Sequence, residues 1–503
     1  MENETISLYE YICKAVVDGH LPNGFSLPQE EDETKIRWMD GALDGVSVYH
    51  MGVSEMPEDG RALMIEAVRT ASDGKFEEAD RLFTKLGQGV HAIAAIDELQ
   101  SYIIDHKSEL SAECIHGYAV HALVTSTDRE CLKYALSIFE LFDTDGNKGL
   151  KRAIRTVGLS DEFSLFSIFV MLRWADGNNE VFQLAKKIHG WGRIHAIERI
   201  EPSNEEIRDW LLKEGVHNEV MSAYSALTCW EKSDAGKILQ GIPTREEFSG
   251  IRDIIEGLLD EGPVPGISQV EDADKVMIRF LELAGNMNLE LDDYDVIRVI
   301  RIYYENENVN HVEIVSLCRK LLESERCRKV VADAVKKGKA IDLARDLNLE
   351  IRDDLFVLLR EAFDEHYHLC RLLVHDSFDR AAVMDLFRQK LPLKDMKTKP
   401  TNSHGLGSEY KRQQQLEHLV QELRYYPMEG IDFVETALQS APIRTRNMGI
   451  AVLEEWVDKR KTPLAELLPE TYTLLCSLRD IETDEKIRKR MDGLIAGDIP
   501  MVD

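Results

Sequence analysis

The sequence lacks any apolar run long enough to cross a bilayer as a helix. Its longest charge-free apolar run covers residues 163–172, whereas a spanning helix needs roughly 20 such residues. The N-terminus also lacks the basic and apolar regions of a secretory signal. Eight cysteines occur without a Cys-x-x-Cys pair or a compact cluster, which argues against a disulfide scaffold or a zinc site. We therefore expect a cytoplasmic chain with reduced, mostly buried thiols.

Basic residues are few relative to acidic ones. The chain has 61 Lys and Arg against 91 Asp and Glu, which gives a formal charge of −30 at pH 7. Because this charge repels phosphate backbones and anionic headgroups, we expect neither nucleic acid nor a membrane as a partner. One local basic run forms either an anion-binding stripe or a helix face paired with nearby carboxylates. It consists of Arg326, Arg328, Lys329, Lys336, Lys337 and Lys339.

The common catalytic motifs are missing as well. The sequence has no Walker loop, no Gly-x-Ser-x-Gly elbow and no His-Glu-x-x-His pair. In the turn that contains Gly190 and Gly192, His195 stands where a dinucleotide fingerprint needs its third glycine, and no strand precedes the turn. We interpret it as a turn between repeats. No cofactor-binding residue is evident.

A partial calcium-loop pattern occurs at residues 143–154. Asp143, Asp145 and Asn147 match the first three ligand positions of an EF-hand. Lys148 replaces the glycine that the sharp turn requires, and Ile154 replaces the bidentate acid. The pattern predicts a turn at a helix end.

What the sequence does contain is helical periodicity. Hydrophobic residues make up 44% and charged residues 30%, which is typical of globular proteins. From Arg61 onward, apolar residues recur at i, i+3 and i+4 in segments of about 12 to 18 residues, separated by Gly-, Asp- or Asn-containing turns. The stripe from Ile251 to Leu259 is a good example. One such stripe cannot bury itself, so short loops predict antiparallel helix pairs stacked on their neighbours.

Several segments are similar to the inner helices of HEAT-type repeats. In residues 442–453 a turn containing Pro442 precedes basic residues and then small and apolar ones, and residues 483–491 and 192–200 look similar. No fixed period is obvious. The predicted fold class is therefore all-α, an α-solenoid of degenerate HEAT-like helical hairpins.

Composition divides the chain further. Residues 1–60 predict an N-terminal helix and a Gly/Pro-rich irregular region, in which the alternating run 46–50 allows a small hairpin. Residues 61–391 predict the repeat array, with a break near 260–272. Residues 392–411 read as a polar linker, and residues 412–503 as C-terminal repeats.

Glu-x-x-His pairs are the candidate metal ligands, because residues i and i+3 share a helix face and di-iron bundles use this spacing. The alternative is solvated histidines on a helix face. The densest set lies at residues 361–368, with His375 beyond it. The pairs are Glu113 with His116, Glu214 with His217, and Glu365 with His368.

A second candidate group has the composition of a protein interface. Trp and Arg are the residues that most often anchor such interfaces. The alternative is that Trp191 closes a repeat turn and Arg199 pairs with Glu198 or Glu201. The group comprises Trp191, Arg193, His195, Glu198 and Arg199.

Residues 7–22 and 37–45, together with 191–212, resemble bacterial proteins that carry the name limonene hydroxylase. The resemblance implies allylic oxidation of a monoterpene to carveol or perillyl alcohol, with further oxidation of those alcohols. Hydroxylation of an unactivated carbon requires an oxygen-activating cofactor. Such a cofactor would come from a di-iron site built on the Glu-x-x-His pairs or from a partner protein.

Three functions follow from the sequence. The first is a protein-interaction scaffold: an α-solenoid whose concave face binds another protein, with the N-terminal region as a cap or docking element. The alternative is the monooxygenase-type oxidoreductase that the resemblance implies. The third is a binding module for a small apolar ligand. Fold alone does not choose between them.

Overall fold

The computed structural model describes residues 6–28, 38–52, 56–262, 264–306 and 311–499. Arg37, at the start of one stretch named above, lies outside them. Contacts divide the chain into two compact units, Met1–Leu321 and Leu322–Asp503. Each unit is described by itself.

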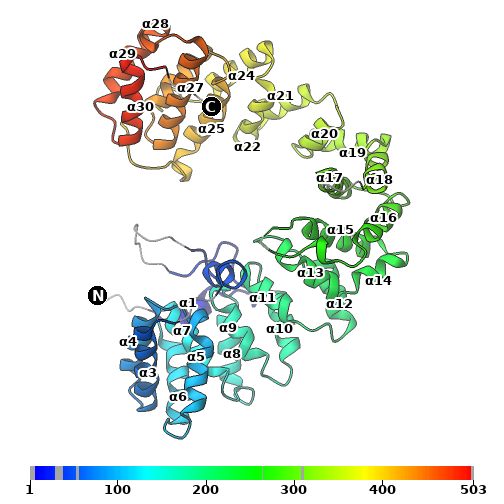
Figure 1. The fold of residues 1–503 in the computed structure, drawn as a ribbon, viewed down its shortest axis with the longest axis vertical. Helices are drawn as coiled ribbons and strands as arrows, with labels where there is room; N and C mark the ends of the chain where they lie inside the picture. The colour runs from blue at the N-terminus through cyan, green and yellow to red at the C-terminus, as the bar shows by residue number, and fades with distance from the viewer. Residues whose placement is uncertain (1–5, 29–37, 53–55, 263, 307–310, 500–503) are drawn as a thin grey trace. The chain divides into compact units, whose positions relative to one another are not determined.

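Unit 1 is built from helices joined by short turns (Figure 1). Its elements are α1 (Leu8–Ala15), α2 (Ala42–Val46), the π-helix η1 (Ser47–Met51), α3 (Glu58–Ser72), α4 (Phe76–Gly87), α5 (Ala92–Asp105), α6 (Ala112–Thr125), α7 (Arg129–Phe139), α8 (Lys148–Val157), α9 (Asp161–Met171), α10 (Gly177–Ala185), α11 (Trp191–Arg199), α12 (Glu205–Glu214), α13 (Ala223–Lys232), α14 (Ala235–Gln240), α15 (Arg245–Leu259), the 3-10 helix η2 (Ile267–Gln269), α16 (Ala273–Ala284), α17 (Leu291–Asn306) and α18 (Val312–Leu322).

A row of odd-numbered helices runs through unit 1. From α5 through α17, each odd-numbered helix contacts the next one, and the intervening helices pack against this row. The stripe predicted from Ile251 to Leu259 is buried in α15, between α13 and α17. Thr244 and Glu247 form a capping box that begins α15. The hairpins therefore stack through their apolar faces, as the periodicity predicts.

The N-terminal region differs from the prediction at one point. The hairpin allowed at residues 46–50 is wrong, because these residues are helical in α2 and η1. The only strand-like pairing among the described residues is an isolated bridge between Val17 and His20, beside the left-handed turn at Gly19.

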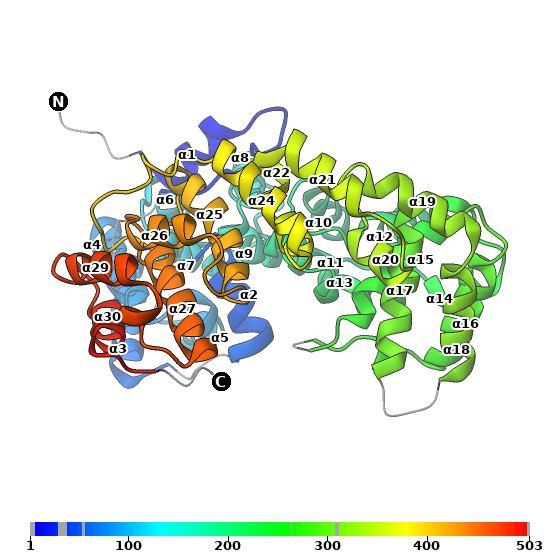
Figure 2. The same cartoon turned by 90° about the horizontal axis from the view of Figure 1, so that it is seen from above.

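Unit 2 continues with helical elements, and Figure 2 shows α29 beside α30 within it. Its elements are α19 (Glu325–Val335), α20 (Ile341–Asp346), α21 (Arg352–Glu361), α22 (Phe363–His366), the 3-10 helix η3 (Tyr367–Leu369), α23 (Cys370–Leu373), α24 (Ser377–Lys390), the 3-10 helix η4 (Ser408–Tyr410), α25 (Lys411–Leu423), α26 (Ile431–Leu438), α27 (Ile443–Arg460), α28 (Leu464–Leu467), α29 (Pro469–Arg479) and α30 (Glu485–Ala496).

The segment between α24 and α25 covers the predicted polar linker. It follows the turn before α27 through backbone hydrogen bonds: the N–H of Thr398 donates to the carbonyl of Gln439, and that of Thr401 to the carbonyl of Ala441. The segment is therefore anchored along the C-terminal hairpins. The domain boundaries drawn from composition stay predictions.

The predicted fold class is confirmed: the chain is all-α, with helical hairpins arranged as an α-solenoid. Within the described residues, no helix is both long and apolar enough to cross a membrane. Five of the eight cysteines are buried, and all eight are free thiols.

Candidate functional site

A short N-terminal segment lies across the row of helices in unit 1. We call residues 38–51, which include α2 and η1, the docked segment. It contacts α7 through Asp44, α9 through Gly41, α11 through Gly45 and α13 through Tyr49. Most of its partners on these four helices lie in their first two turns; Glu198, which accepts from Tyr49, lies near the end of α11. The segment therefore covers the N-terminal ends of four successive helices of one row.

A fully buried lysine anchors the docked segment. Lys133 is 1% exposed, and its Nζ lies 2.7 Å from Asp44, 2.7 Å from Glu162 and 3.2 Å from Glu130. Burial disfavours its charge, but the three carboxylates outweigh burial and hold the pKa of Lys133 well above its usual value. Burial likewise opposes the charge of Glu130, yet Lys133 lowers the pKa of Glu130 to about 2. Lys133 likewise lowers the pKa of Glu162 against the effect of burial, whereas burial raises the pKa of Asp44 to about 6.

Arg129 contacts both the chain that precedes the docked segment and the segment itself. Its guanidinium lies 2.8 Å from Asp40 and donates to the carbonyls of Leu27 and Pro28, each at 3.1 Å. Asp40 in turn accepts the N–H of Leu27 at 2.9 Å. One side chain of α7 therefore fixes both the chain before residue 29 and the start of the docked segment.

Asp161, at the start of α9, lies against the backbone of three glycines, one of which belongs to the docked segment. Its Oδ1 accepts the N–H of Gly192 at 2.9 Å, and a Cβ added at Gly190 would lie 2.2 Å from its Oδ2. A Cβ at Gly41 would lie 2.6 Å from its carbonyl oxygen. Burial of the carboxyl raises the pKa of Asp161 to about 7; the Gly192 hydrogen bond opposes this and nearby carboxylates add to it. Only glycine fits at these three positions.

An aromatic cluster holds the end of the docked segment. A Cβ at Gly45 would lie 2.2 Å from the ring of Trp191, so the backbone of α2 rests directly on that ring. The ring of Tyr49 packs against the rings of Trp191 and Tyr224, at centroid distances of 5.9 and 5.1 Å, and those two rings also contact each other at 4.8 Å. The Tyr49 hydroxyl donates to Glu198 at 3.1 Å. His50 hydrogen-bonds the hydroxyl of Tyr224. Ring packing and hydrogen bonds therefore both hold the end of the docked segment against α11 and α13.

The five residues predicted as an interface divide into two groups. Trp191, Arg193 and His195 are buried, so their predicted role as a surface does not match their position. Arg193 donates to the carbonyl of Glu214. Burial and the nearby Arg199 lower the pKa of His195 to about 3, and neither of its ring nitrogens has a hydrogen-bond partner in the described structure. Only Glu198 and Arg199 reach solvent, where they pair at 2.8 Å, as the alternative interpretation proposed.

The candidate metal pairs are not among the residues that contact the docked segment. Glu113 is exposed, whereas His116 packs against Phe139. Glu365 is exposed, and His368 is half-buried beside His366. Within the described ranges, no three His, Cys, Asp or Glu side chains are grouped so that they could hold one metal ion. A metal site stays a prediction.

Two other sequence patterns have structural roles. Asn147 caps α8 by accepting the N–H groups of Gly149 and Leu150, and Asp143 accepts that of Asp145. The partial calcium loop is thus a turn next to a helix. His217 of the remaining Glu-x-x-His pair lies 3.5 Å from Glu214 and 3.1 Å from Asp253.

Sequence reasoning missed the charges that hold the docked segment. Lys133 lies within an entirely buried stretch of α7, from Cys131 to Phe139. A lysine inside an apolar run was the available signal, because a lysine is almost never fully buried unless it is paired.

The docked segment also presents apolar side chains outward. Met39 is 82% exposed and Met51 is 59% exposed, and Val48 between them is exposed as well. These side chains belong to a backbone that the contacts above hold in place.

Comparisons with known proteins give no family. No family model matches the chain, and no curated protein matches it. A solved structure described as a circular tandem repeat protein with novel repeat topology and enhanced subunit contact surfaces shares 15% sequence identity with the chain. The match covers 87% of each chain, with a TM-score of 0.11. No functional conclusion follows from this likeness.

Proposed function

We propose that the chain is a protein-interaction scaffold whose docked segment contacts the partner. The observation that supports this is the exposure of Met39 and Met51 on a backbone fixed by buried ion pairs. Exposed apolar side chains that occur singly need no explanation, but two on one short anchored segment favour a binding role. Met side chains also adapt readily to a partner surface.

The energetics of the docked segment support the same proposal. Burying Lys133 and its carboxylates carries a desolvation cost of several kcal/mol per ion, which the pairing offsets. An apolar contact would hold a segment at least as firmly, so the buried ions favour one specific position of the segment over others. A fixed position matters if another molecule must recognise the segment.

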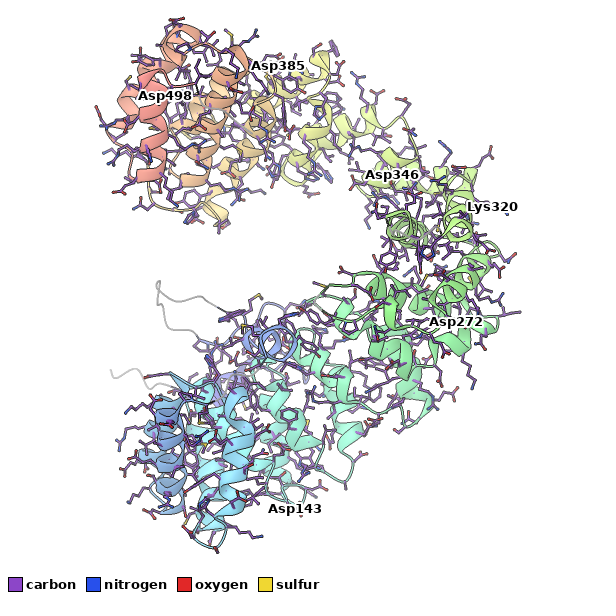
Figure 3. All side chains as sticks on the ribbon, viewed as in Figure 1. Asp143, Asp272, Lys320, Asp346, Asp385 and Asp498 are labelled. Atoms are coloured by element: carbon purple, nitrogen blue, oxygen red, sulfur yellow. The ribbon has the colours of Figure 1, made fainter. Side chains whose placement is uncertain are left out.

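The charge of unit 1 indicates the chemistry of the partner. Residues 1–321 contain 58 Asp and Glu against 32 Lys and Arg, a formal charge of −26, whereas residues 322–503 contain 33 against 29. Asp143 and Asp272, both labelled in Figure 3, are among the exposed acids of unit 1. A basic partner surface would be attracted to this unit and steered towards it.

Affinity capture from native lysate tests the proposal when matched variants are compared. We expect wild type to capture a partner that the double variant Met39→Ser, Met51→Ser loses. Ile104→Ser is the control, because Ile104 is an exposed apolar residue of α5 outside the docked segment. Capture of the same proteins by all three chains would overturn the proposal.

Oxidation of a monoterpene stays a prediction from the resemblance, as does binding of a small apolar ligand. Incubation of the purified chain with limonene, a reductase and oxygen tests both, with carveol and perillyl alcohol as the products to be measured. Binding of limonene without turnover would support the third function alone.

A further inference from the structure

The sequence contains a single Asn-Gly dipeptide, Asn23-Gly24, in a turn that precedes the docked segment. Both residues are exposed. The N–H of Phe25 donates to the carbonyl of Pro22 at 3.0 Å and closes the turn, and Gly24 has a left-handed backbone with a φ of 75°. Glycine is the residue that such a turn favours at this position. The dipeptide therefore lies at the tip of a closed surface turn.

An asparagine followed by glycine can lose its side-chain amide without an enzyme. The main-chain nitrogen of the glycine attacks Cγ of the asparagine and closes a succinimide ring. Three conditions favour this attack: an asparagine side chain that is not held, a following N–H that no acceptor holds, and no bulk beside the attacking nitrogen. Glycine meets the last condition best because it has no Cβ.

Asn23 and Gly24 meet all three conditions. The side chain of Asn23 makes no hydrogen bond with any other described residue. The N–H of Gly24 donates to no acceptor in the part of the chain that the structure describes. A Cβ added at Gly24 would have no atom within 4 Å, so the space around the nitrogen is open. The turn therefore leaves both reacting groups accessible.

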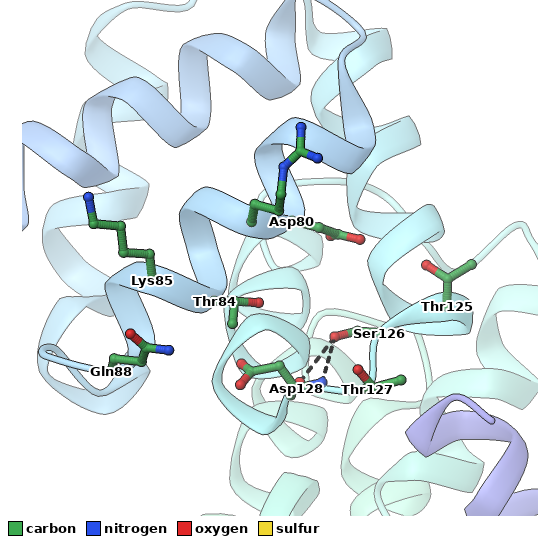
Figure 4. A pocket seen from close by; sticks show the side chains of 9 residues that line it. Asp80, Thr84, Lys85, Gln88, Thr125, Ser126, Thr127 and Asp128 are labelled. Atoms are coloured by element: carbon green, nitrogen blue, oxygen red, sulfur yellow. Dashed lines mark hydrogen bonds between the residues drawn. The ribbon is translucent and has the colours of Figure 1, made fainter. Parts of the chain in front are cut away.

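Other turns in unit 1 hold their backbone N–H groups. In the turn between α6 and α7, drawn in Figure 4, the N–H of Asp128 donates to the hydroxyl of Ser126 at 3.1 Å. In the docked segment, the N–H of Gly41 donates to Glu162 at 2.9 Å, and that of Gly45 donates to the carbonyl of Gly41 at 3.0 Å. The nitrogen of Gly24 differs from these because no acceptor holds its proton.

Asn402 offers a comparison within the same chain. It is exposed as well, and the small residue Ser403 follows it. The N–H of Ser403, however, donates to the hydroxyl of Thr401 at 3.3 Å, and its side chain adds bulk beside the nitrogen. The same reaction is therefore disfavoured at Asn402.

From this geometry we infer that Asn23 is a site of spontaneous covalent modification, at which deamidation through a succinimide produces aspartate and isoaspartate. The nitrogen of Gly24 forms a bond to Cγ of Asn23 while the bond from Cγ to Nδ2 breaks. The proton lost by the Gly24 nitrogen leaves with the amide group as ammonia. Water then opens the ring at one of its two carbonyls. Opening at Cγ gives aspartate, and opening at the main-chain carbonyl gives isoaspartate, whose backbone passes through Cβ and Cγ.

Both products change the chain before the docked segment. Each adds a negative charge, and isoaspartate also adds a carbon atom to the main chain of the turn. The ring of Phe25 in this turn packs against Tyr11 of α1 at a centroid distance of 5.7 Å. Shortly after the turn, the carbonyls of Leu27 and Pro28 accept hydrogen bonds from Arg129. The modification therefore falls between two anchored points, and its inference does not rest on the proposed function.

Peptide mapping by mass spectrometry tests the inference on the folded full chain after incubation at pH 6 and at pH 8. Trypsin releases residues 15–35, in which Asn23 is the only asparagine, and residues 398–411, in which Asn402 is the only one. We expect conversion of amide to acid to be about tenfold faster or more in the first peptide. Both aspartate and isoaspartate should form at position 23. The rate should be higher at pH 8, because base removes the proton from the Gly24 nitrogen.

Matched variants isolate the role of the attacking nitrogen. Gly24→Ala places a methyl group beside it and should slow conversion at Asn23 about tenfold or more. Gly89→Ala adds a methyl group at another open position and should leave the rate unchanged. Asn23→Gln, which should stop conversion at this position, serves if Gly24→Ala does not fold. Equal rates at Asn23 and Asn402, aspartate without isoaspartate, or a rate far below that of the urea-unfolded chain would overturn the inference.

Discussion

Arg446 and Glu482 form a doubly hydrogen-bonded ion pair inside unit 2, at 2.8 and 2.7 Å, and both side chains are 1% exposed. Arg446 also donates to the carbonyls of Ala441 and Thr401. One guanidinium therefore joins the start of α27, the segment before α25 and the turn before α30.

The same relationship recurs along the chain. Arg252 pairs with Asp293, which lies 41 residues later, and Arg380 pairs with Glu429, 49 residues later, while Arg446 and Glu482 are 36 residues apart. The first separation lies within the length of a HEAT repeat, about 40 to 47 residues, and the other two lie outside it. The arginine side chain is at most 10% exposed in all three pairs, whereas the acid ranges from fully buried Asp293 to Glu429, which is 42% exposed.

Removing one partner of the Arg446 pair should destabilise unit 2. We expect Arg446→Leu to lower the free energy of unfolding by about 3–5 kcal/mol, because Glu482 would stay buried without its partner. Hydrogen exchange of α27 amides measures this locally. Arg479→Leu breaks an exposed pair with Asp492 and should cost at most about 1 kcal/mol. Similar losses in the two variants would contradict the expected role of burial.

Lys133→Met should release the docked segment. The substitution leaves Asp44, Glu130 and Glu162 close together without their cation, at an expected cost of about 3–5 kcal/mol. Limited proteolysis should then cut within residues 38–51 much faster than in wild type. Lys75→Met removes an exposed lysine paired with Asp73 and should not change the cleavage rate. Unchanged protection in Lys133→Met would mean that the apolar contacts alone hold the segment.

Gly45→Ala should displace α2 from Trp191. The added methyl group would lie 2.2 Å from the indole ring, which forces the backbone or the ring to move. Overpacking of this kind costs about 1–3 kcal/mol. Faster hydrogen exchange at residues 42–51 would report it. Gly146→Ala serves as the control, since no atom lies within 4 Å of its added methyl group, and it should leave exchange unchanged.

The stability of the docked segment should fall as the pH rises towards 7. The folded pKa of Asp161, about 7, lies above the value of 3.8 that an unperturbed Asp has, so the docked state binds the proton more tightly. The stabilisation from this proton is present at pH 4 and is lost by about pH 7. Asp44, whose pKa burial raises to about 6, acts in the same direction.

The titration of His195 changes the stability of the docked segment in the opposite direction and at lower pH. Its folded pKa of about 3 lies below the unfolded value of 6.5, so its contribution to stability grows with pH and is complete by about pH 6.5. Hydrogen exchange at residues 42–51, corrected for intrinsic rates, should therefore show decreasing protection from pH 6.5 to pH 7.5 in wild type. Asp161→Asn should flatten this dependence. A variant with the same dependence as wild type would exclude Asp161 as its source.

Helical periodicity predicted the fold because each helix carries an apolar stripe that packs against its neighbours, as the stripe from Ile251 to Leu259 does between α13 and α17. That signal is local, so one sequence suffices to read it. The docked segment was not predictable in the same way. Asp44 and Glu162 both pair with Lys133 across large sequence separations, and this pairing depends on how the helices stack. Composition likewise predicted Trp191 and Arg193 as surface residues of an interface, although both are buried. The residue types that anchor interfaces also fill buried contacts, so composition does not separate the two.

The docked segment also has a mechanical consequence for unit 1. A solenoid bends when neighbouring repeats tilt against each other, and its stiffness is ordinarily a property of each nearest-neighbour interface. The docked segment spans α7, α9, α11 and α13, so it acts as a brace that couples four repeats. A bend between these helices must change at least one of its contacts, such as that of Asp44 with Lys133 or that of Tyr49 with Tyr224. Elastic deformation of unit 1 is therefore concentrated in the repeats on either side of the brace.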